Sequence, residues 1–421
     1  MLPKTKIVVL LFSATFVAYG LVGGMWSGVS ISAPDNAYQG LTTFTEVLSK
    51  VKEDYVEEPD LEKAMSGALH GMMEALDPYS SFIDNDTYQR IQRSKAEAIA
   101  SPGVILSKRY GYVYVVSVVP GSSGYLEGLK SGDLIESIEG RMTTRMSLWE
   151  ARKLFLGERG STVSIRVVRG RRSKPAEIDL VRENLTFSDV STRMVEDGIG
   201  FLKIPHLQEG VSKSVVSNLK ILQSVGIQAL VIDLRGTAVG EVKGVVRVSD
   251  LFLPKGKKIF TLRDRGGNEV DYLSANDPIV VAVPMMLLVD GGTSGMAEIF
   301  VAALLDHKVA GTVGEKTNGS GSLQEIFHLK DGSVLQISTK LFYRPDGRVI
   351  QARKLRDSGI TPDVRSPSQE FITSFYFENT DGGMLEILED GFYQKLKDAV
   401  EAEQFEEALR QIRRQLNSKA A

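Results

Sequence analysis

The sequence predicts a multidomain protein in which an α/β domain and a β-rich domain lie between helical N- and C-terminal regions. Three observations lead to this prediction. The chain has 421 residues, about two to three times the length of a typical domain. Strand-like and helix-like segments alternate over residues 198–314, as in a mostly parallel sheet with right-handed crossovers. Before them, residues 96–172 carry short strand patterns with few helices.

Composition excludes several classes of protein and several kinds of site. Apolar residues make up 43% and charged residues 24%, which is ordinary for a globular chain and excludes collagen-like and disordered classes. With 50 basic and 53 acidic residues, the chain has no basic field that would hold nucleic acid. Zero cysteines and four histidines exclude disulfides and thiolate catalysis and disfavour metal sites. We expect no nucleic-acid partner, no cofactor and no metal.

Residues 1–34 predict a targeting segment. Lys4 and Lys6 precede an uncharged, largely apolar stretch from Ile7 to Pro34, which is long enough to cross a bilayer. This pattern is typical of a signal peptide or a signal anchor, and we favour a retained anchor over cleavage. The rest of the chain is then expected in the cell envelope, as periplasmic or other extracytoplasmic domains anchored to the membrane.

Both ends of the exported part are predicted to be helical. Over residues 35–95, apolar residues recur three and four positions apart, and Asp77-Pro78 ends the second helix. Over residues 381–421, the apolar side of a helical tail comprises Leu388, Phe392, Leu396, Val400, Phe405, Leu409 and Ile412. We expect the tail to pack on the body of the protein or on a second copy, because its acidic residues disfavour a membrane surface.

Between these ends, two domains follow in order. Residues 96–172 carry strand patterns at 103–106, 112–119, 133–138 and 163–168, with helical segments at 122–128 and 147–156. A basic turn at 169–174 is interpreted as a solvated loop.

Residues 173–380 carry the βαβ alternation. Its expected strands are 198–204, 229–234, 279–283, 286–290 and 309–314, and its expected helices are 211–224, 244–252 and 294–305. Since function in such sheets gathers at the carboxyl ends of the strands, we expect a site at residues 235–240, 291–297 and 316–324.

Five sequence blocks then appear in a characteristic order. They are Tyr55-Val-Glu-Glu-Pro-Asp, Gly67-Ala-Leu-His-Gly-Met-Met-Glu-Ala-Leu-Asp-Pro-Tyr-Ser-Ser-Phe, Gly314-Glu-Lys-Thr-Asn-Gly-Ser-Gly-Ser-Leu-Gln, Tyr343-Arg-Pro-Asp-Gly-Arg-Val-Ile-Gln and Gly359-Ile-Thr-Pro-Asp. Together they resemble the carboxy-terminal processing peptidases of serine peptidase family S41, over about residues 40–365. The resemblance implies an inserted PDZ domain that binds a substrate's C-terminal carboxylate. It also implies a peptidase domain with a Ser/Lys dyad and a supporting Gln.

The expected carboxylate-binding loop consists of Ser101, Pro102, Gly103 and Val104. Backbone N–H groups in such a turn bind a carboxylate, and a peptide adds to the adjoining sheet edge. Pro102 departs from the apolar residue usual at this place and has no N–H to donate. The alternative is a domain that packs only on its own chain, as a lid.

The dyad positions carry other residues in this chain. The resemblance places the nucleophilic serine three positions before a glutamate at a helix start, and with Glu298 as that glutamate the position is Gly295. The family's lysine lies between two glycines, and that position is Ser320. The supporting glutamine is retained as Gln324. A lysine base and a serine nucleophile must both be present for this chemistry.

The turn that resembles the family's oxyanion turn is altered as well. It reads Asp233-Leu-Arg-Gly-Thr-Ala-Val-Gly, in which Gly236 and Gly240 are glycines and Val239 replaces one. A β-branched residue resists the positive φ that glycine permits.

A displaced dyad is the competing interpretation. Ser294 precedes the Gly295 position, and Lys316 lies four residues before Ser320. A shift of one residue at a helix start turns a side chain by about 100°, which misplaces a nucleophile. His307 is interpreted as structural, and the other three histidines show no metal-ligand spacing.

The sequence therefore predicts a non-catalytic S41 homologue of the cell envelope, a pseudoenzyme that acts as a scaffold or regulator. It recognises protein C-termini or pairs with an active protease relative, and it forms a homodimer through its helical ends. The first alternative is an active serine-type endopeptidase that uses Ser294. The second is a purely structural assembly protein without affinity for C-terminal peptides.

Overall fold

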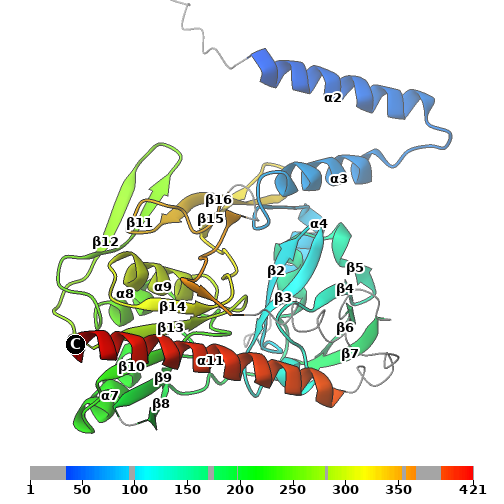
Figure 1. Cartoon of the computed structure of the whole chain (residues 1–421). Coiled ribbons are helices and arrows are strands. Elements are labelled where there is room, and N and C mark those ends of the chain that lie inside the picture. Colours follow the sequence, from blue (N-terminus) through cyan, green and yellow to red (C-terminus); the bar gives the residue numbers. More distant parts are fainter. Residues whose placement is uncertain are drawn as a thin grey trace, which may run out of the picture. The chain divides into compact units, whose positions relative to one another are not determined.

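The architecture was obtained as a computed structural model of the chain (Figure 1). It describes residues 35–93, 100–168, 175–196, 198–279, 283–352, 357–366 and 390–420. The expected signal segment, residues 1–34, lies outside these ranges. Within them, no helix combines the length and the apolar character that a membrane span requires. The chain divides into two units, residues 1–68 and 69–421.

The described part of the first unit, residues 35–68, is mainly helical, as expected. It contains α2, Asp35–Asp54, and most of α3, Leu61–Glu74, whose last residues belong to the second unit. The apolar residues Leu41, Phe44 and Val47 recur along α2 and are exposed within the single chain.

The second unit begins with a tight turn after α3. The Asp77 carboxylate accepts hydrogen bonds from the N–H groups of Tyr79 and Ser80, each at 2.8 Å, and so fixes the turn around Pro78. The turn leads into β1, Ser81–Ile83, and α4, Asn85–Arg93. The sequence did not predict β1, because three residues carry no period and the strand exists through its antiparallel pairing with β16.

The β-rich domain is a twisted antiparallel sheet with two short helices. Its strand order is β2-β3-β4-β6-β7, with β5 beside β4. The strands are β2, Val104–Arg109; β3, Tyr112–Val118; β4, Leu134–Ile138; β5, Arg141–Met142; β6, Thr162–Val168; and β7, Ala176–Val181. Strand β7 lies beyond residue 172, so this sheet extends past the boundary that the sequence suggested.

Serine caps start both helices of this domain. Ser122 caps α5, Ser123–Leu126, and Ser147 caps α6, Leu148–Leu154, each accepting a backbone N–H three residues later. A 3-10 turn, Thr143–Arg145, lies between β5 and α6.

The α/β domain has the predicted βαβ alternation. Its sheet order is β17-β14-β13-β10-β9-β8, parallel except for β8 at one edge. The strands are β8, Ser191–Glu196; β9, Ile199–Lys203; β10, Ala229–Asp233; β13, Met285–Val289; β14, Gly311–Gly314; and β17, Val364–Arg365. The helices are α7, Val211–Ser224; α8, Val242–Ser249; and α9, Met296–Asp306. The strand expected at 279–283 lies partly outside the described residues, and Val283 is not in a strand.

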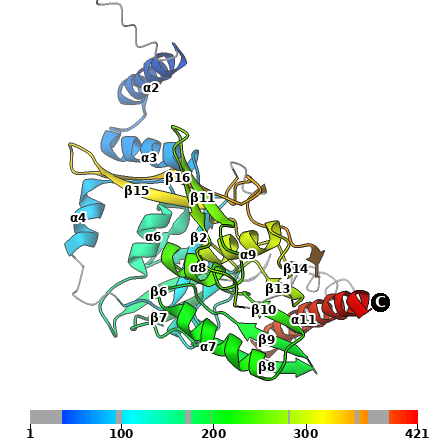
Figure 2. The ribbon, with the colours of Figure 1, turned by 90° about the vertical axis from the view of Figure 1, so that its left-hand side faces the viewer.

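Alternate residues of the central strands pack on opposite layers. Leu230 and Ile232 of β10 join the core formed with α7, α8 and α9. Ala229 and Val231 join the core formed with α11, Asp390–Ala420, the long helix drawn in red in Figure 1. Figure 2 shows this arrangement from the side. The prediction that the tail packs on the body of the protein is thus confirmed for Phe405, Leu409 and Ile412.

A third sheet was not predicted from the sequence. It is built from β11, Lys258–Asp264; β12, Glu269–Leu273; β15, Ser322–His328; β16, Val334–Tyr343; and β1. Strands β12 and β15 are largely exposed on both faces, so their sequences lack the regular apolar alternation of a half-buried strand.

Candidate functional site

Gly295 lies at a strained turn between β13 and α9. Its φ is 61° and its ψ is −115°, a conformation that side-chain-bearing residues rarely adopt. Sharp strand-to-helix turns of this kind present nucleophiles in several hydrolase folds. A Cβ built on Gly295 meets no atom within 4 Å. The turn therefore leaves space for a side chain, although any residue other than glycine would be strained at this φ.

Glu298, in the first turn of α9, joins this turn to the loop at 315–321. Its side chain is fully buried and accepts four hydrogen bonds. They come from the N–H groups of Gly295, Gly319 and Ser320 and from the hydroxyl of Thr317, at 2.5–2.9 Å. Gly295 and Ser320 both donate to Oε2 at 2.9 Å, so the two positions that the resemblance assigns to the dyad are adjacent.

Burial raises the pKa of Glu298 to about 7, while the four hydrogen bonds act to lower it. The charge of this carboxyl group therefore changes near neutral pH. Its partners all donate, so the ionised form satisfies them best.

Ser294, the displaced candidate, is 5% exposed and points toward a loop amide. Its Oγ accepts a hydrogen bond from Asn318 Nδ2 at 3.0 Å, and its N–H donates to the Thr237 carbonyl. Asn318 Oδ1 in turn accepts from Tyr114 of β3 at 2.6 Å. A carboxamide cannot remove a proton from the serine, so this arrangement positions the hydroxyl without activating it.

The other three candidates of the dyad region lie on the loop at 315–321 and on β15, which follows it. Lys316 and Ser320 are both half-buried. Gln324, on β15, donates from Nε2 to Ser322 Oγ at 2.7 Å and to the Ser322 carbonyl at 3.1 Å. The retained glutamine is therefore bound to neighbouring serines of its own sheet.

The turn after β10 differs from an open oxyanion site. The Gly236 N–H donates to Asp290 Oδ1 at 2.9 Å, and the Gly236 carbonyl accepts from Ser117 of β3 at 2.5 Å. Gly236 has a φ of 69°, whereas Val239 and Gly240 keep negative φ, as expected for valine. The Val239 carbonyl accepts the Leu207 N–H at 2.8 Å. A negative charge developing beside Gly236 would meet the Asp290 carboxylate rather than a free donor.

Asp233 anchors this turn to the tail helix. Burial by itself raises the pKa of Asp233, but Lys203 and Arg235 outweigh burial and hold the pKa below its usual value. Arg235 also donates from Nη1 to the Glu401 carbonyl on α11 at 2.8 Å. The turn is therefore fixed by a buried charged network.

Comparison with known proteins gives the family. Residues 198–366 match the sequence model of peptidase family S41, residues 114–169 that of the PDZ domain, and residues 29–87 that of the N-terminal domain of the activating protease CtpB. Residues 198–366 therefore carry the sequence signature of peptidase family S41. The PDZ domain is the β-rich domain, inserted before the S41 domain.

Named relatives cover most of the chain. A carboxy-terminal-processing protease of Bartonella bacilliformis is 29% identical over 362 residues, 85% of this chain and 82% of that protein. The carboxy-terminal processing protease CtpA of Bacillus subtilis is 27% identical over 352 residues, 83% of this chain and 73% of that protein. The photosystem II D1 C-terminal processing protease shares the fold, with a TM-score of 0.62, 23% identity and coverage of 76% of this chain and 92% of that one.

Backbone groups of the expected carboxylate-binding loop of the PDZ domain are already hydrogen-bonded within the domain. The Gly103 N–H donates to Ser101 Oγ at 3.2 Å, and the Pro102 carbonyl accepts the Gly124 N–H. Gly103 has a φ of 77°, so the loop needs glycine there. A carboxylate would take the Gly103 N–H from Ser101, whose hydroxyl is then free to donate.

Four contacts at the candidate site were not predicted from the sequence. They are the Asn318 bridge between Ser294 and Tyr114, the Asp290 acceptor, the Ser117 contact and the fourfold acceptor Glu298. Only Glu298 left a signal, as the glutamate at the start of α9 that fixes the position of Gly295, but its four donors were not predicted. His307 Nε2 lies 2.7 Å from the Lys258 carbonyl, a contact that supports the predicted structural role. Among the described residues, no cluster of side chains offers a metal site.

Proposed function

We propose that this protein is a non-catalytic S41 homologue that binds protein C-termini through its PDZ domain. One observation supports the loss of catalysis above the others. Gly295 occupies the strained turn before α9, and Ser320 is adjacent to it through Glu298, so the two residues proposed for the dyad positions supply neither nucleophile nor base.

The proposed oxyanion residues support the same function. Gly236 donates to a carboxylate, and the PDZ strand β3 caps the carbonyl side of the turn through Ser117. Transition states of acyl transfer need donors that are free and preorganised where negative charge develops. The chain offers Asp290 there instead.

The alternative is an active endopeptidase that uses Ser294. A hydroxyl held by the Asn318 carboxamide favours a positioning role for Ser294 over a nucleophilic one. Lys316 remains the proposed base of this alternative.

The setting of the protein is also a proposal. We place it in the cell envelope, with the segment 1–34 as its membrane anchor. The exposed residues Leu41, Phe44 and Val47 of α2 favour a homodimer, or a pair with an active protease relative, through the N-terminal helices.

Peptide binding tests the proposed function. A fluorescent peptide ending in a free Val carboxylate is expected to bind the full chain in mild detergent. The same peptide with a C-terminal amide is expected to bind about tenfold more weakly or worse, because it loses charge-assisted hydrogen bonds to the loop. Fluorescence anisotropy measures both affinities.

A pair of glycine variants locates the binding site. Gly103→Ala brings its Cβ within 2.3 Å of Ser122 Cβ and is expected to abolish binding. Gly140→Ala introduces the same strain, since φ is 72° there, but its Cβ meets no atom within 4 Å. Equal binding by the two variants, or by the acid and amide peptides, would contradict the assignment.

A further inference from the structure

A side chain from outside the PDZ sheet packs beside β2, the strand to which a peptide would add. β2 is an edge strand of its sheet, and a peptide that adds to this edge lies between β2 and α6. Tyr79, from the turn after α3, is 6% exposed and belongs to the PDZ core with Leu106 and Leu148. Its hydroxyl lies 3.5 Å from Ser107 Oγ on β2. Tyr79 therefore contacts β2 and the PDZ core next to the edge where a peptide would add.

Arg152 of α6 contacts both Tyr79 and β2. Its guanidinium lies over the Tyr79 ring, 5.8 Å from the ring centroid. Its Nε and Nη2 donate to the Leu106 carbonyl at 3.2 and 2.8 Å. Leu106 is on the edge strand, so Arg152 binds a backbone acceptor beside the place that an added strand would take.

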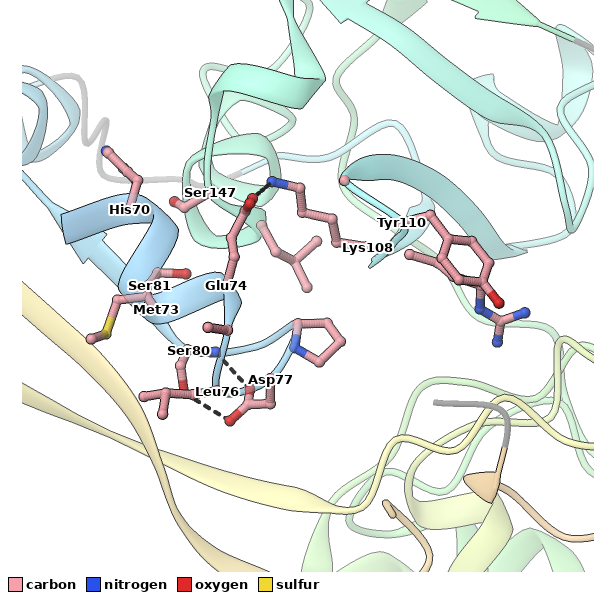
Figure 3. Close-up of a pocket in the computed structure, with 15 residues that line it drawn as sticks. His70, Met73, Glu74, Leu76, Asp77, Ser80, Ser81, Lys108, Tyr110 and Ser147 are labelled. Carbon is pink, nitrogen blue, oxygen red and sulfur yellow. Dashed lines mark hydrogen bonds and ion pairs between the residues drawn. The ribbon is translucent and has the colours of Figure 1, made fainter. Parts of the chain in front are cut away.

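Pro78 and Ser80, the neighbours of Tyr79, line a cavity of about 300 Å³ with basic residues on one wall and acidic residues on another (Figure 3). The wall from β2 carries Lys108 and Arg109, and the wall from the segment 74–80 carries Glu74 and Asp77. The Lys108 side chain is 6% exposed, forms an ion pair with Glu74 and donates to the Met146 carbonyl at 2.8 Å. Removing Glu74 would leave a buried ammonium without a carboxylate, which is strongly unfavourable.

We propose that the segment Glu74–Ser80 is an internal ligand of the PDZ groove, replaced by protein C-termini with an aromatic residue third from the end and an acidic residue fifth from the end. The proposal rests on the proposed function and names the ligand of that site. The aromatic side chain takes the place of Tyr79 over Arg152. The acidic side chain takes the place of Glu74 on Lys108.

The spacing follows from strand geometry. Residues pair one to one in an antiparallel ladder, and alternate side chains share a face. A chain whose last residue faces Val104 places its third-last residue at Leu106 and its fifth-last at Lys108. These three residues alternate along β2 and so share one face of the strand, and all three are buried.

Release of the segment Glu74–Ser80 would also change a contact with the S41 domain. Ser80 Oγ accepts the Ser338 N–H of β16 at 3.2 Å. Ser338 Oγ accepts from Gln324 Nε2 at 3.3 Å. Peptide binding would therefore break a contact next to the retained glutamine.

The test uses the full chain in mild detergent and the probe fluorescein-Gly-Ser-Glu-Ala-Tyr-Ala-Val. Anisotropy compares it with the same peptide carrying Gln for Glu, or Ala for Tyr. Each change is expected to weaken binding about tenfold, the scale of one lost charged or aromatic contact. Equal affinities for the three peptides would overturn the proposal.

Three variants separate the internal ligand from a merely structural segment. Tyr79→Ala is expected to tighten probe binding about tenfold, because an empty groove needs no displacement. Phe327→Ala, which removes an exposed aromatic ring of β15, is expected to leave the affinity unchanged. Lys108→Met is expected to equalise the Glu and Gln peptides. Unchanged affinity in Tyr79→Ala, or a retained preference for Glu in Lys108→Met, would overturn the proposal.

Hydrogen exchange on the unaltered chain gives a readout that needs no variant. The Tyr79 and Ser80 N–H groups are bound to Asp77 and are expected to exchange faster once the probe is bound. Slower or unchanged exchange with the probe bound would contradict displacement. If no peptide binds any form, including Tyr79→Ala, the proposed function fails; if peptides bind without displacement or preference, only this inference fails.

Discussion

A chain that carries both Gly295→Ser and Ser320→Lys is expected to hydrolyse unstructured peptides with apolar C-termini. The two positions are adjacent through Glu298 Oε2, and a Cβ at Gly295 meets no atom within 4 Å. Removing a complete triad costs about 10⁶-fold in rate, and one missing oxyanion donor costs about 10²–10³-fold. Because Gly236 still donates to Asp290, we expect a rate about 10³-fold above that of the unaltered chain.

Single variants are the controls for this restoration. Gly295→Ser alone lacks the base and Ser320→Lys alone lacks the nucleophile, so each is expected to stay near the background rate. Release of a fluorescent C-terminal fragment measures all four chains. A folded double variant no faster than either single variant would show that these are not the positions of the lost dyad.

The free energy of unfolding is expected to depend on pH through Glu298. Its pKa is raised from 4.5 to about 7 in the folded chain, so the folded state binds the proton more tightly than the unfolded state. The stabilisation is complete below about pH 4.5 and is lost as pH rises through about 7. At 1.36 kcal/mol per pKa unit, this shift is worth about 3 kcal/mol.

Chemical denaturation at pH 5 and pH 8 measures this effect as a difference between two chains. The stability of the unaltered chain relative to Glu298→Gln is expected to fall by about 3 kcal/mol between the two pH values. Glu325→Gln, at an exposed glutamate paired with Lys340, is the matched control. A relative stability that rises with pH would mean that the hydrogen bonds to Glu298 outweigh its burial.

The local sequence pattern was sufficient to predict the strands that are buried on both faces. The runs that form β9, β10 and β13 are continuous and apolar, so the βαβ core was predictable from the sequence. The hairpins β11–β12 and β15–β16 were not, because they are stabilised by pairing with distant strands and show no regular alternation.

The candidate site was likewise predictable only in part. Motif spacing identified Gly295 and Ser320 separately, but their adjacency depends on Glu298, whose four partners come from two segments of the chain. The place of Tyr79 was equally invisible, since the sequence marks Asp77-Pro78-Tyr79 only as a helix stop. Its burial in the PDZ core is a tertiary contact.

The most direct test of the account is a peptidase assay of the unaltered chain beside Ser294→Ala and Lys316→Ala. Unstructured substrates with apolar C-termini are incubated with each protein, and new N-termini are counted by mass spectrometry. The account predicts no cleavage above the buffer control and no difference among the three chains. Cleavage by the unaltered chain that disappears in Ser294→Ala or Lys316→Ala would contradict it.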